Sequence, residues 1–418
     1  MRIHMLSIGT TGDVMPMIRL GEELKRRGHT VQIAAYEPLC TLIGQAGLEY
    51  YCLPGDAYRY ISELIRPGKS PVTFLNRLNR AVREEIRPLM QALIDAAKGA
   101  DALVLTYFGS IGYSIAEKLN IPCFQLHYYP MDQNNEVPLA IMPPIRLGQA
   151  YNRLTYQLAY LAVGGLEHHY LHRWRKLNGM RARRIRTRPD YTVGKWKIPV
   201  LYAISQQILP RSIIWPPNIH MVGFLQSIQP EAYIPSPALK AFLEKGPAPI
   251  YIGFGSMTTG DMGEMLNIVL ASLRKAGLRA VMLKGWGEMP DRCLPSYVYM
   301  ADFIPHSWLF EQVCAVVHHG GAGTTAAGLY AGKPTLVIPF GGDQPFWASR
   351  IYRRGLGPKP ITRSRVTEEK LTITLKRLVE NPCYAENARY IRDHLRMENG
   401  AVNAANVILE KAATFPKV

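Results

Sequence analysis

Short apolar runs alternate with helical patterns through the first half of this chain. The runs IHMLSIG, TVQIAAY, DALVLTY and CFQLHYY are rich in β-branched and aromatic residues, which is typical of buried strands. Between them stand patterns such as MIRLGEELKRRG and SIGYSIAEKLN, whose apolar residues recur with the period of a helix. This repetition of strand, helix and strand predicts a parallel sheet covered by helices.

The second half of the chain repeats the alternation. Strands are predicted at APIYIGFGS, RAVMLKG, YVYMADFI, CAVVHHGG and PTLVIPF, and helices at MGEMLNIVLASLRKAG and EEKLTITLKRLVEN. The region from about residue 143 to 199 interrupts the pattern with a long, basic helical stretch. A final periodic pattern over residues 385–413 predicts one long helix.

The length of 418 residues exceeds what one hydrophobic core organises, so two domains are expected. We predict an α/β protein of two tandem doubly wound, Rossmann-like parallel-sheet domains that face each other across a cleft. The predicted parts are an N-terminal domain (1–225), a linker with three prolines (226–240), a C-terminal domain (241–384) and a helix that crosses back to the N-terminal domain (385–418). In such sheets, ligands bind beyond the carboxyl ends of the strands.

Composition narrows the class of protein. Apolar residues make up 48% of the chain and charged residues 19%, which excludes extended disorder. No metal site is predicted, because zinc-ligand spacing is absent from the six cysteines, and a reducing compartment is expected. The N-terminus MRIHMLSIGTTGD has only a short apolar run, so we expect neither a signal peptide nor a membrane span, and a cytoplasmic protein that could associate with membranes.

The net charge of +17 is unevenly distributed. The segment from Arg173 to Lys197 carries ten basic residues and only one acidic residue, Asp190, and supplies about half of the excess. With Trp174 and Trp196 nearby, it could contact anionic membrane headgroups, although a solvated surface is the favoured explanation of the charge. Nucleic-acid binding is not expected, because no nucleic-acid-binding module is recognisable.

A glycine-rich turn follows the strand CAVVHH. His319, Gly321, Gly323, Thr324 and Thr325 stand where a helix begins, and helix N-termini with nearby glycines favour an anion such as a diphosphate. The turn matches neither a Walker loop nor GxGxxG. Alternatively, the glycines make only a tight turn, Thr324 caps the helix, and the histidine pair lies in the interior.

Three further strand ends carry polar or aromatic residues. Ser256 could reach a phosphate, Phe303 and the backbone of Ile304 could hold a flat base, and Asp343 with Gln344 could bind several sugar hydroxyls. The alternatives are a serine cap, core packing of Phe303, and an aspartate cap for the helix that begins near Pro345.

These segments together resemble a known family. IPHSWLF, VVHHGGAGTTAAGLYAGKPTLVIPFGGDQPFWASRI and GTTGDVMPMIRLGEELKRRGHTV are similar to family 1 glycosyltransferases of GT-B fold, above all the sterol glucosyltransferase branch and bacterial natural-product enzymes. The resemblance implies that His319 and the glycine–threonine turn contact the donor diphosphate, that Asp343 and Gln344 bind the sugar, and that Phe303 lies against the base. Plant members carry a glutamate for the ribose where this chain has Ala327, which leaves the choice between UDP and dTDP open.

The turn SIGTTGDVMP ends the first strand and places Asp13 at the start of a helix. The resemblance assigns an aspartate here the role of base, which would take the proton of the attacking hydroxyl and contribute about 10² to 10⁴ in rate. The alternative is an ordinary helix cap, and His127 and Asp132 are weaker candidates for the base. An apolar acceptor pocket is predicted from a set of large side chains near the strand ends: Met15, Tyr107, Phe108, His127, Tyr128 and Tyr129.

The expected reaction is an inverting transfer of a hexose, with glucose as the first candidate, from a UDP- or dTDP-sugar to a hydrophobic alcohol such as a sterol, terpenoid, phenol or lipid. We expect no metal or other cofactor, because no DxD motif occurs and the turn can stabilise the leaving diphosphate. Two alternatives are a sugar-nucleotide epimerase and a non-catalytic protein that binds nucleotide sugars.

Overall fold

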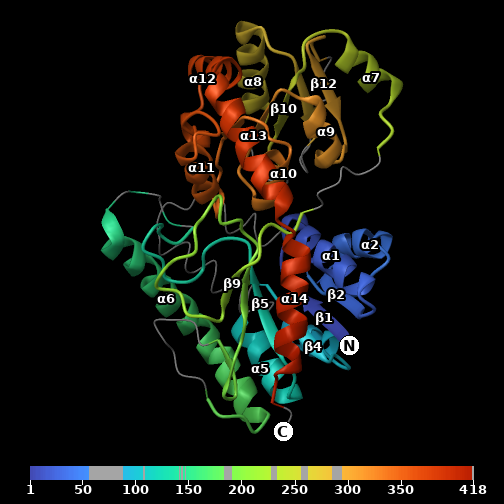
Figure 1. Ribbon diagram of the computed structural model, residues 1–418, viewed down its shortest axis with the longest axis vertical. Coiled ribbons are helices and arrows are strands. Elements are labelled where there is room, and N and C mark those ends of the chain that lie inside the picture. Colours follow the sequence, from blue (N-terminus) through green and yellow to red (C-terminus); the bar gives the residue numbers. More distant parts are fainter. Residues whose placement is uncertain are drawn as a thin grey trace. The chain divides into compact units, whose positions relative to one another are not determined.

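The computed structural model divides the chain into two compact units, each with a parallel sheet (Figure 1). Unit 1 comprises Met1–Gln206, Pro210–Leu225 and Asn399–Val418, and unit 2 comprises Gln207–Leu209 and Gln226–Glu398. The structure describes residues 1–55, 88–106, 109–140, 142, 145, 147–182, 191–226, 233–255, 262–284 and 294–416, without the side chains of 109–110, 162–170 and 262. The prediction of an α/β protein with parallel sheets in two domains is confirmed.

Unit 1 contains a sheet of seven strands in the order β3-β2-β1-β4-β5-β8-β9, and every neighbouring pair is parallel. The strands are β1 (Arg2–Leu6), β2 (Thr30–Tyr36), β3 (Glu49–Leu53), β4 (Ala102–Leu105), β5 (Cys123–His127), β8 (Val200–Tyr202) and β9 (Ile219–Met221). A separate hairpin joins β6 (Thr192–Val193) to β7 (Trp196–Lys197). The apolar runs of the first half therefore form the strands they predict.

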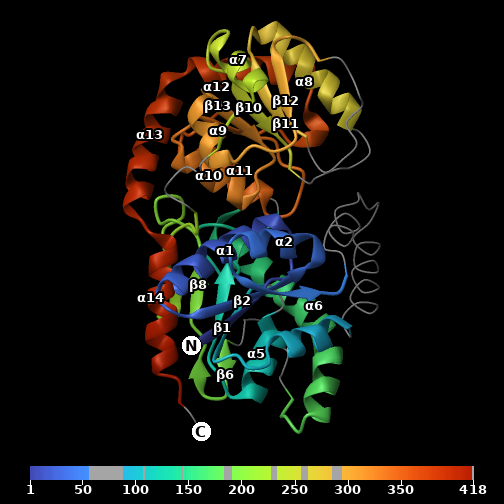
Figure 2. The same ribbon diagram turned by 90° about the vertical axis from the view of Figure 1, so that its right-hand side faces the viewer.

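Helices cover this sheet. They are α1 (Thr11–Arg26), α2 (Glu37–Gln45), α5 (Gly109–Leu119), α6 (Gly148–Leu177) and α14 (Gly400–Ala413). The apolar side of α1 is fully buried at Val14, Met17 and Leu20, and α14 packs beside α1 (Figures 1 and 2). The Arg27 guanidinium donates to the Asn406 side chain over 2.7 Å, so a hydrogen bond supplements the apolar contact.

Unit 2 contains a sheet of five strands in the order β12-β11-β10-β13-β14, again parallel throughout. Its strands are β10 (Ile250–Gly253), β11 (Ala280–Leu283), β12 (Val298–Ala301), β13 (Ala315–His318) and β14 (Thr335–Val337). Its helices are α7 (Pro237–Glu244), α8 (Met262–Ala276), α9 (His306–Gln312), α10 (Ala322–Tyr330), α11 (Gln344–Arg353), α12 (Glu368–Glu380) and α13 (Pro382–Met397), with a short 3₁₀ turn at Arg363–Arg365.

Alternation along β10 buries both faces of the unit 2 sheet. Ile250 and Ile252 pack with apolar residues of α8 and α12, whereas Tyr251 between them packs with residues of α9 and α10. Side chains of successive strand residues point to opposite faces, so one strand contributes to two cores. This arrangement fixes the carboxyl ends of the strands, where the glycine-rich turn lies.

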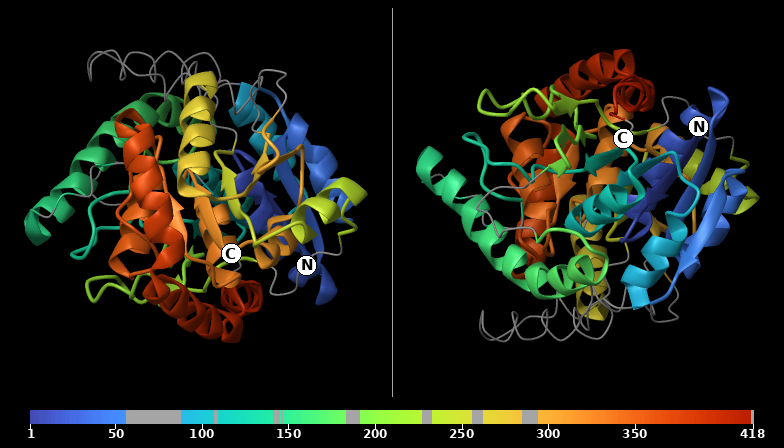
Figure 3. Two further views of the ribbon diagram at one scale, coloured as in Figure 1. Left: turned by 90° about the horizontal axis from the view of Figure 1, so that it is seen from above. Right: turned by 90° about the horizontal axis from the view of Figure 1, so that it is seen from below.

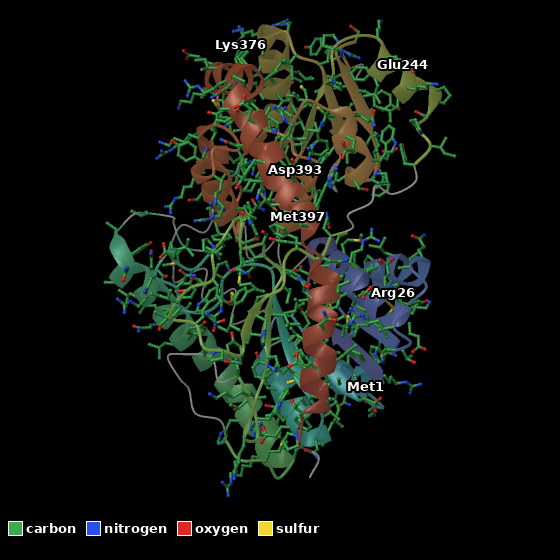
Figure 4. The ribbon with its side chains drawn as sticks, in the orientation of Figure 1. Met1, Arg26, Glu244, Lys376, Asp393 and Met397 are labelled. Carbon is green, nitrogen blue, oxygen red and sulfur yellow. A yellow bond between two sulfur atoms is a disulfide. The ribbon has the colours of Figure 1, made fainter. Side chains whose placement is uncertain are left out.

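The C-terminal pattern differs from its prediction, because two helices replace the single helix expected over residues 385–413. α13 ends at Met397, which Figure 4 labels, and α14 begins at Gly400 with Asn399 as its N-cap. The Asn399 side chain accepts a hydrogen bond from Val402 N over 3.2 Å. Gly400 lies against the carbonyls of Gly223 and Phe224, where a side chain would collide with the backbone. The Asn399 cap and the close backbone contact of Gly400 therefore stand where the predicted single helix is divided into α13 and α14.

Two other sequence expectations need correction. The last part of the predicted linker is helical, because α7 begins at Pro237 and Ser236 accepts a hydrogen bond from Leu239 N. The cysteine spacing indicated a reducing compartment, yet Cys40 of α2 and Cys52 of β3 form a disulfide. Parallel pairing of β3 with β2 brings these cysteines together, which spacing along the chain does not reveal. Within the described residues, no helix has the length and apolar composition to cross a bilayer.

Candidate functional site

The turn between β13 and α10 has the geometry of an anion site. Gly320 adopts a left-handed φ of +98°, and Gly321 is the N-cap of α10. Residues Gly321 to Thr324 are partly exposed, whereas the residues that follow are buried. The first N–H groups of a helix lack partners inside the helix, so this turn presents backbone donors at an accessible place.

His319 stands beside these donors with its ring between two glycines. A Cβ at Gly255 would lie 2.9 Å from His319 Cε1, and a Cβ at Gly321 would lie 2.6 Å from His319 Nε2. Burial lowers the pKa of His319 to about 4, and the nearby Gly253 backbone opposes that shift. Among the described residues, its Nδ1 atom is buried without a hydrogen-bond partner. The free protein thus holds a neutral imidazole at pH 7.

The other histidine of the pair has a different role. His318 is fully buried at the end of β13, and its Nδ1 accepts a hydrogen bond from Gly320 N over 2.9 Å. Burial lowers the pKa of His318 well below its usual value. His318 therefore supports the glycine turn from inside, as the interior alternative predicted for both histidines.

The two threonines are also distinct. Thr325 is buried and its hydroxyl donates to Gly321 O over 2.9 Å, so the helix already uses that group. Thr324 is partly exposed in the first turn of α10. Of the two hydroxyls, that of Thr324 is the one placed to meet a ligand.

The turn before α11 lies against the glycine turn. A Cβ at Gly320 would be 3.1 Å from Gln344 O, so the backbones of the two turns are in close contact. The Gln344 side chain is buried, and its Oε1 accepts hydrogen bonds from Phe340 N and Gly341 N over 2.7 and 3.2 Å. The amide NH₂ of Gln344 is the remaining polar end of that side chain. Two predicted groups of site residues thus meet at one edge of the sheet.

Asp343 is the N-cap residue of α11, but its side chain makes no capping hydrogen bond. Instead its Oδ2 accepts a hydrogen bond from Trp347 Nε1 over 3.0 Å, which fixes the direction of the carboxylate. The alternative prediction that Asp343 caps α11 is therefore correct for the position of the residue. It does not describe the side chain, which accepts a hydrogen bond from Trp347 instead.

Two adjacent residues after β12, Phe303 and Ile304, differ in exposure. The Phe303 side chain is 72% exposed, whereas Ile304 is buried in the core of unit 2. An exposed ring is available for stacking, so core packing does not explain Phe303. Ser256 lies outside the described residues.

A further partly buried histidine, His306, lies near His319 and was not among the residues predicted from the sequence. Its Nε2 lies 3.0 Å from the Tyr251 hydroxyl, and its ring stacks on Phe310 at a centroid distance of 4.7 Å. Burial, with a smaller electrostatic effect of His319, lowers the pKa of His306 to about 4. His306 lies in the segment IPHSWLF, two residues after Ile304, so this segment contained the signal.

In unit 1, Asp13 is the third residue of α1 and forms a capping box with Thr10. Asp13 Oδ2 accepts from Thr10 N over 2.8 Å and from Thr10 Oγ1 over 3.3 Å. A Cβ at Gly9 would collide with this carboxylate, so the GTTGD turn requires glycine there. The side chain of Asp13 is held rigidly at the carboxyl end of β1, and the helix-cap alternative is part of its role.

Close to this turn lies a buried polar network. Tyr128 donates to Asp13 O over 2.7 Å, and the preceding residue, His127, has Nε2 3.2 Å from the Tyr191 hydroxyl. Tyr191 and Tyr202 both donate to Asp132 Oδ2, over 3.1 and 2.7 Å. The network thus joins the ends of β5 and β8 to the loop after β5.

Burial dominates the electrostatics of this network. It lowers the pKa of His127 to about 3 and raises the pKa of Asp132 to about 6. Because Tyr191 donates to Asp132, its oxygen can accept from His127 Nε2–H, which leaves the lone pair on His127 Nδ1. That Nδ1 atom is buried and has no partner among the described residues. Tyr191 and Tyr202 were not anticipated, because their positions carry no sequence motif.

The remaining predicted acceptor residues divide into three groups. Tyr128 is buried, and Met15 and Tyr129 are partly exposed, all near the carboxyl ends of the sheet. Tyr107 and Phe108 lie outside the described residues, as do 183–190 of the basic segment. The described basic residues of the segment from Arg173 to Lys197 are exposed, except that Arg175 is buried and donates to Glu117 over 2.9 Å.

Comparison with known proteins gives this geometry a context. Residues 3–135 match the family described as the glycosyltransferase family 28 N-terminal domain, and residues 282–407 match the erythromycin biosynthesis protein CIII-like C-terminal domain. The chain therefore carries a glycosyltransferase family 28 N-terminal domain followed by an erythromycin biosynthesis protein CIII-like C-terminal domain. The N-terminal match contains the turn between β1 and α1, and the C-terminal match contains the turns before α10 and α11.

Several relatives are named sterol 3-beta-glucosyltransferases. The chain is 31% identical to UGT80A2 of Arabidopsis thaliana, over 98% of its own length and 65% of the relative. It is 33% identical to the Yarrowia lipolytica enzyme, over 98% of its own length and 28% of the relative. The chain therefore spans less than two thirds of these relatives' lengths.

Solved structures share the fold of this chain. The calicheamicin glycosyltransferase CalG4 superposes with a TM-score of 0.72 at 16% identity, covering 99% of this chain and 98% of that one. VinC, solved in complex with DTDP, superposes with a TM-score of 0.69 at 18% identity, covering 99% and 100%. At these identities the likeness establishes the architecture.

Proposed function

We propose that the protein transfers a hexose, with glucose as the first candidate, from a UDP- or dTDP-sugar to a hydroxyl of a hydrophobic acceptor. One observation carries the proposal: the accessible N-terminus of α10 places backbone donors beside a neutral His319 and against the turn of Gln344. The names of the relatives support glucose as the sugar and a sterol as the first acceptor to test.

The donor nucleotide sugar would be held by both turns of unit 2. The N–H groups of Gly321 and Gly323, with Thr324 and His319, would bind the diphosphate, and Thr325 would act by supporting the helix start. Asp343 and the Gln344 amide would bind sugar hydroxyls. The exposed ring of Phe303, with the backbone of Ile304, would hold the base, and Ser256 would add a phosphate contact.

Proton linkage should accompany diphosphate binding. The free protein holds His319 neutral because burial lowers its pKa to about 4. A bound diphosphate places negative charge beside the ring and favours the imidazolium, so the pKa rises in the complex. Diphosphate affinity should therefore increase as the pH falls from 8 to 6, a trend that replacement of His319 by glutamine would remove.

The chemical step would be a direct displacement. The acceptor oxygen forms a bond to the anomeric carbon as the bond from that carbon to the diphosphate oxygen breaks, and the hydroxyl proton passes to Asp13. Attack from the side opposite the leaving group inverts the anomeric centre. We propose that the helix N-terminus and His319 stabilise the leaving diphosphate without a metal ion.

The acceptor would be recognised mainly by apolar contacts, for which Met15, Tyr107, Phe108, His127, Tyr128 and Tyr129 are the proposed residues. A lipophilic alcohol resides in membranes, and we propose peripheral contact with anionic lipid through the segment from Arg173 to Lys197. Reversal of several of these charges should reduce binding to anionic liposomes, and unchanged binding would exclude that segment.

A mass-spectrometric screen tests the proposed reaction directly. Purified protein is incubated with UDP-glucose or dTDP-glucose and a panel of sterols, phenols and lipids, and a product heavier by one hexose is expected with at least one pair. Nucleotide binding without any transfer would favour the non-catalytic alternative. Conversion of the sugar nucleotide itself, without an acceptor, would favour an epimerase.

A further inference from the structure

Helix α6 has one anchored face and one apolar face that the described part of unit 1 leaves uncovered. On the anchored face, Tyr156 and Thr155 are buried, and Asn152 donates to Asn135 O over 2.7 Å. Near the other end of α6, the buried Arg175 forms an ion pair with the partly exposed Glu117. These contacts fix the rotation of α6 about its own axis.

The opposite face carries four exposed leucines. Leu154, Leu158 and Leu161 lie in α6 within an arc of roughly 60° at 3.6 residues per turn, and Leu147 is the N-cap residue that precedes them. In this order, their side chains are 49, 53, 47 and 64% exposed. Figure 3 shows α6 at the edge of its unit, with no drawn helix or strand over its outer side. We call these four residues the leucine stripe.

Basic residues accompany the leucine stripe. Arg153 is exposed beside Leu154, and Arg173 and Lys176 are exposed near the end of α6. Among the described side chains from residue 145 to 182 there is no carboxylate. A row of apolar side chains edged by cations fits the boundary between lipid headgroups and acyl chains. A second copy of this chain, with its net charge of +17, would instead bring like charges together.

We propose that the leucine stripe of α6 inserts into the surface of an anionic membrane, so that α6 lies in the plane of the headgroups. This extends the membrane contact proposed above from a charged segment to an oriented helix face. It does not depend on sugar transfer, because binding can be measured without any substrate.

Vesicle flotation tests the proposal. The full chain should float with vesicles of phosphatidylcholine and phosphatidylglycerol, and the double variant Leu154→Glu, Leu158→Glu should lower the partition coefficient at least about tenfold. The matched control is Ile373→Glu, Val379→Glu on α12, where the side chains are 53 and 38% exposed and the charge change is the same. The control should float like the wild type, and all three proteins should bind UDP equally.

Three outcomes would overturn the proposal. The wild type could fail to float, or the leucine variant could float as well as the control variant. Light scattering without vesicles could also show a wild-type dimer that the leucine variant dissociates, which would mean that a second copy covers the stripe. Flotation that depends on the leucines, together with a negative transfer screen, would retain this inference and reject the proposed reaction.

Discussion

The imidazole of His319 lies between two glycines, so its position depends on the absence of two side chains. Gly321→Ala would place a methyl group 2.6 Å from His319 Nε2 and force the ring to move. We expect at least a tenfold loss of UDP affinity by calorimetry, with a small change in thermal unfolding. Gly328→Ala in the same helix makes only an ordinary contact of 3.4 Å and is the matched control, with unchanged affinity.

Asp13 combines a helix cap with the proposed role of base, and two variants separate these functions. Asp13→Asn keeps an oxygen for the hydrogen bond from Thr10 N but removes the base, so kcat should fall about 10² to 10⁴ with little loss of stability. Thr10→Ala weakens the capping box and should lower the free energy of unfolding by about 1 kcal/mol, while kcat changes only a few-fold. Full activity of Asp13→Asn would show that Asp13 is not the base. His127 would then be the next residue to replace.

Asp132 provides a test of the buried network through pH. Burial raises the pKa of its carboxyl to about 6, above the ordinary value of 3.8 that holds in the unfolded chain. Folding therefore favours the protonated form of Asp132. The stability that this group contributes is fully present below about pH 4 and is lost as the pH rises through 6. Asp132→Asn cannot ionise, so its unfolding free energy relative to wild type should increase by on the order of 2 kcal/mol between pH 4 and 7.5.

Denaturant titrations of wild type and Asp132→Asn at each pH measure this difference in unfolding free energy. The histidines are common to both proteins, so their titration cancels in the difference. A difference that is independent of pH would show that Asp132 ionises normally in the folded protein.

At the scale of elements, periodicity predicted most of the strands because the sheets are buried on both faces. The run TVQIAAY coincides with β2, and the turn after CAVVHH begins α10 as expected. Hydrogen-bond networks were not predictable in this way, since Tyr191, Tyr202 and Asp132 meet only after the sheet has assembled. Likewise, the surroundings of His318 and His319 differ although the residues are adjacent, because His318 ends β13 inside the core and His319 begins the turn that follows.

The division between α13 and α14 depends on Gly400, whose environment excludes a side chain. Helix propensity alone predicts that Gly400→Ala stabilises the protein by about 0.5 to 1 kcal/mol. Because the methyl group would meet the carbonyls of Gly223 and Phe224, we expect destabilisation of at least about 2 kcal/mol instead. Chemical denaturation measures this change. Gly263→Ala, in α8 with open space around it, should not lower stability, and equal behaviour of both variants would contradict the steric argument.

At the scale of the molecule, the repeated strand–helix alternation predicted two domains. It did not predict every place where the chain passes from one unit to the other. Three residues of the first half, Gln207–Leu209, belong to unit 2, where the Arg350 guanidinium donates to Ile208 O over 2.9 Å through Nε. The placement of these three residues in unit 2 involves a hydrogen bond to a backbone carbonyl, and the pattern of side chains along the sequence does not predict such a contact.

Apart from the short excursion of Gln207–Leu209, the polypeptide enters unit 2 after Leu225 and returns to unit 1 at Asn399, so a covalent connection between the units stands at each of these two places. A protease that cuts once near residue 230 would leave a C-terminal fragment whose last helix is still an integral part of the N-terminal unit. Such a nicked protein should migrate as one species under native conditions and as two fragments in detergent. Co-expression of the same two fragments should reconstitute the assembly without a peptide bond between them.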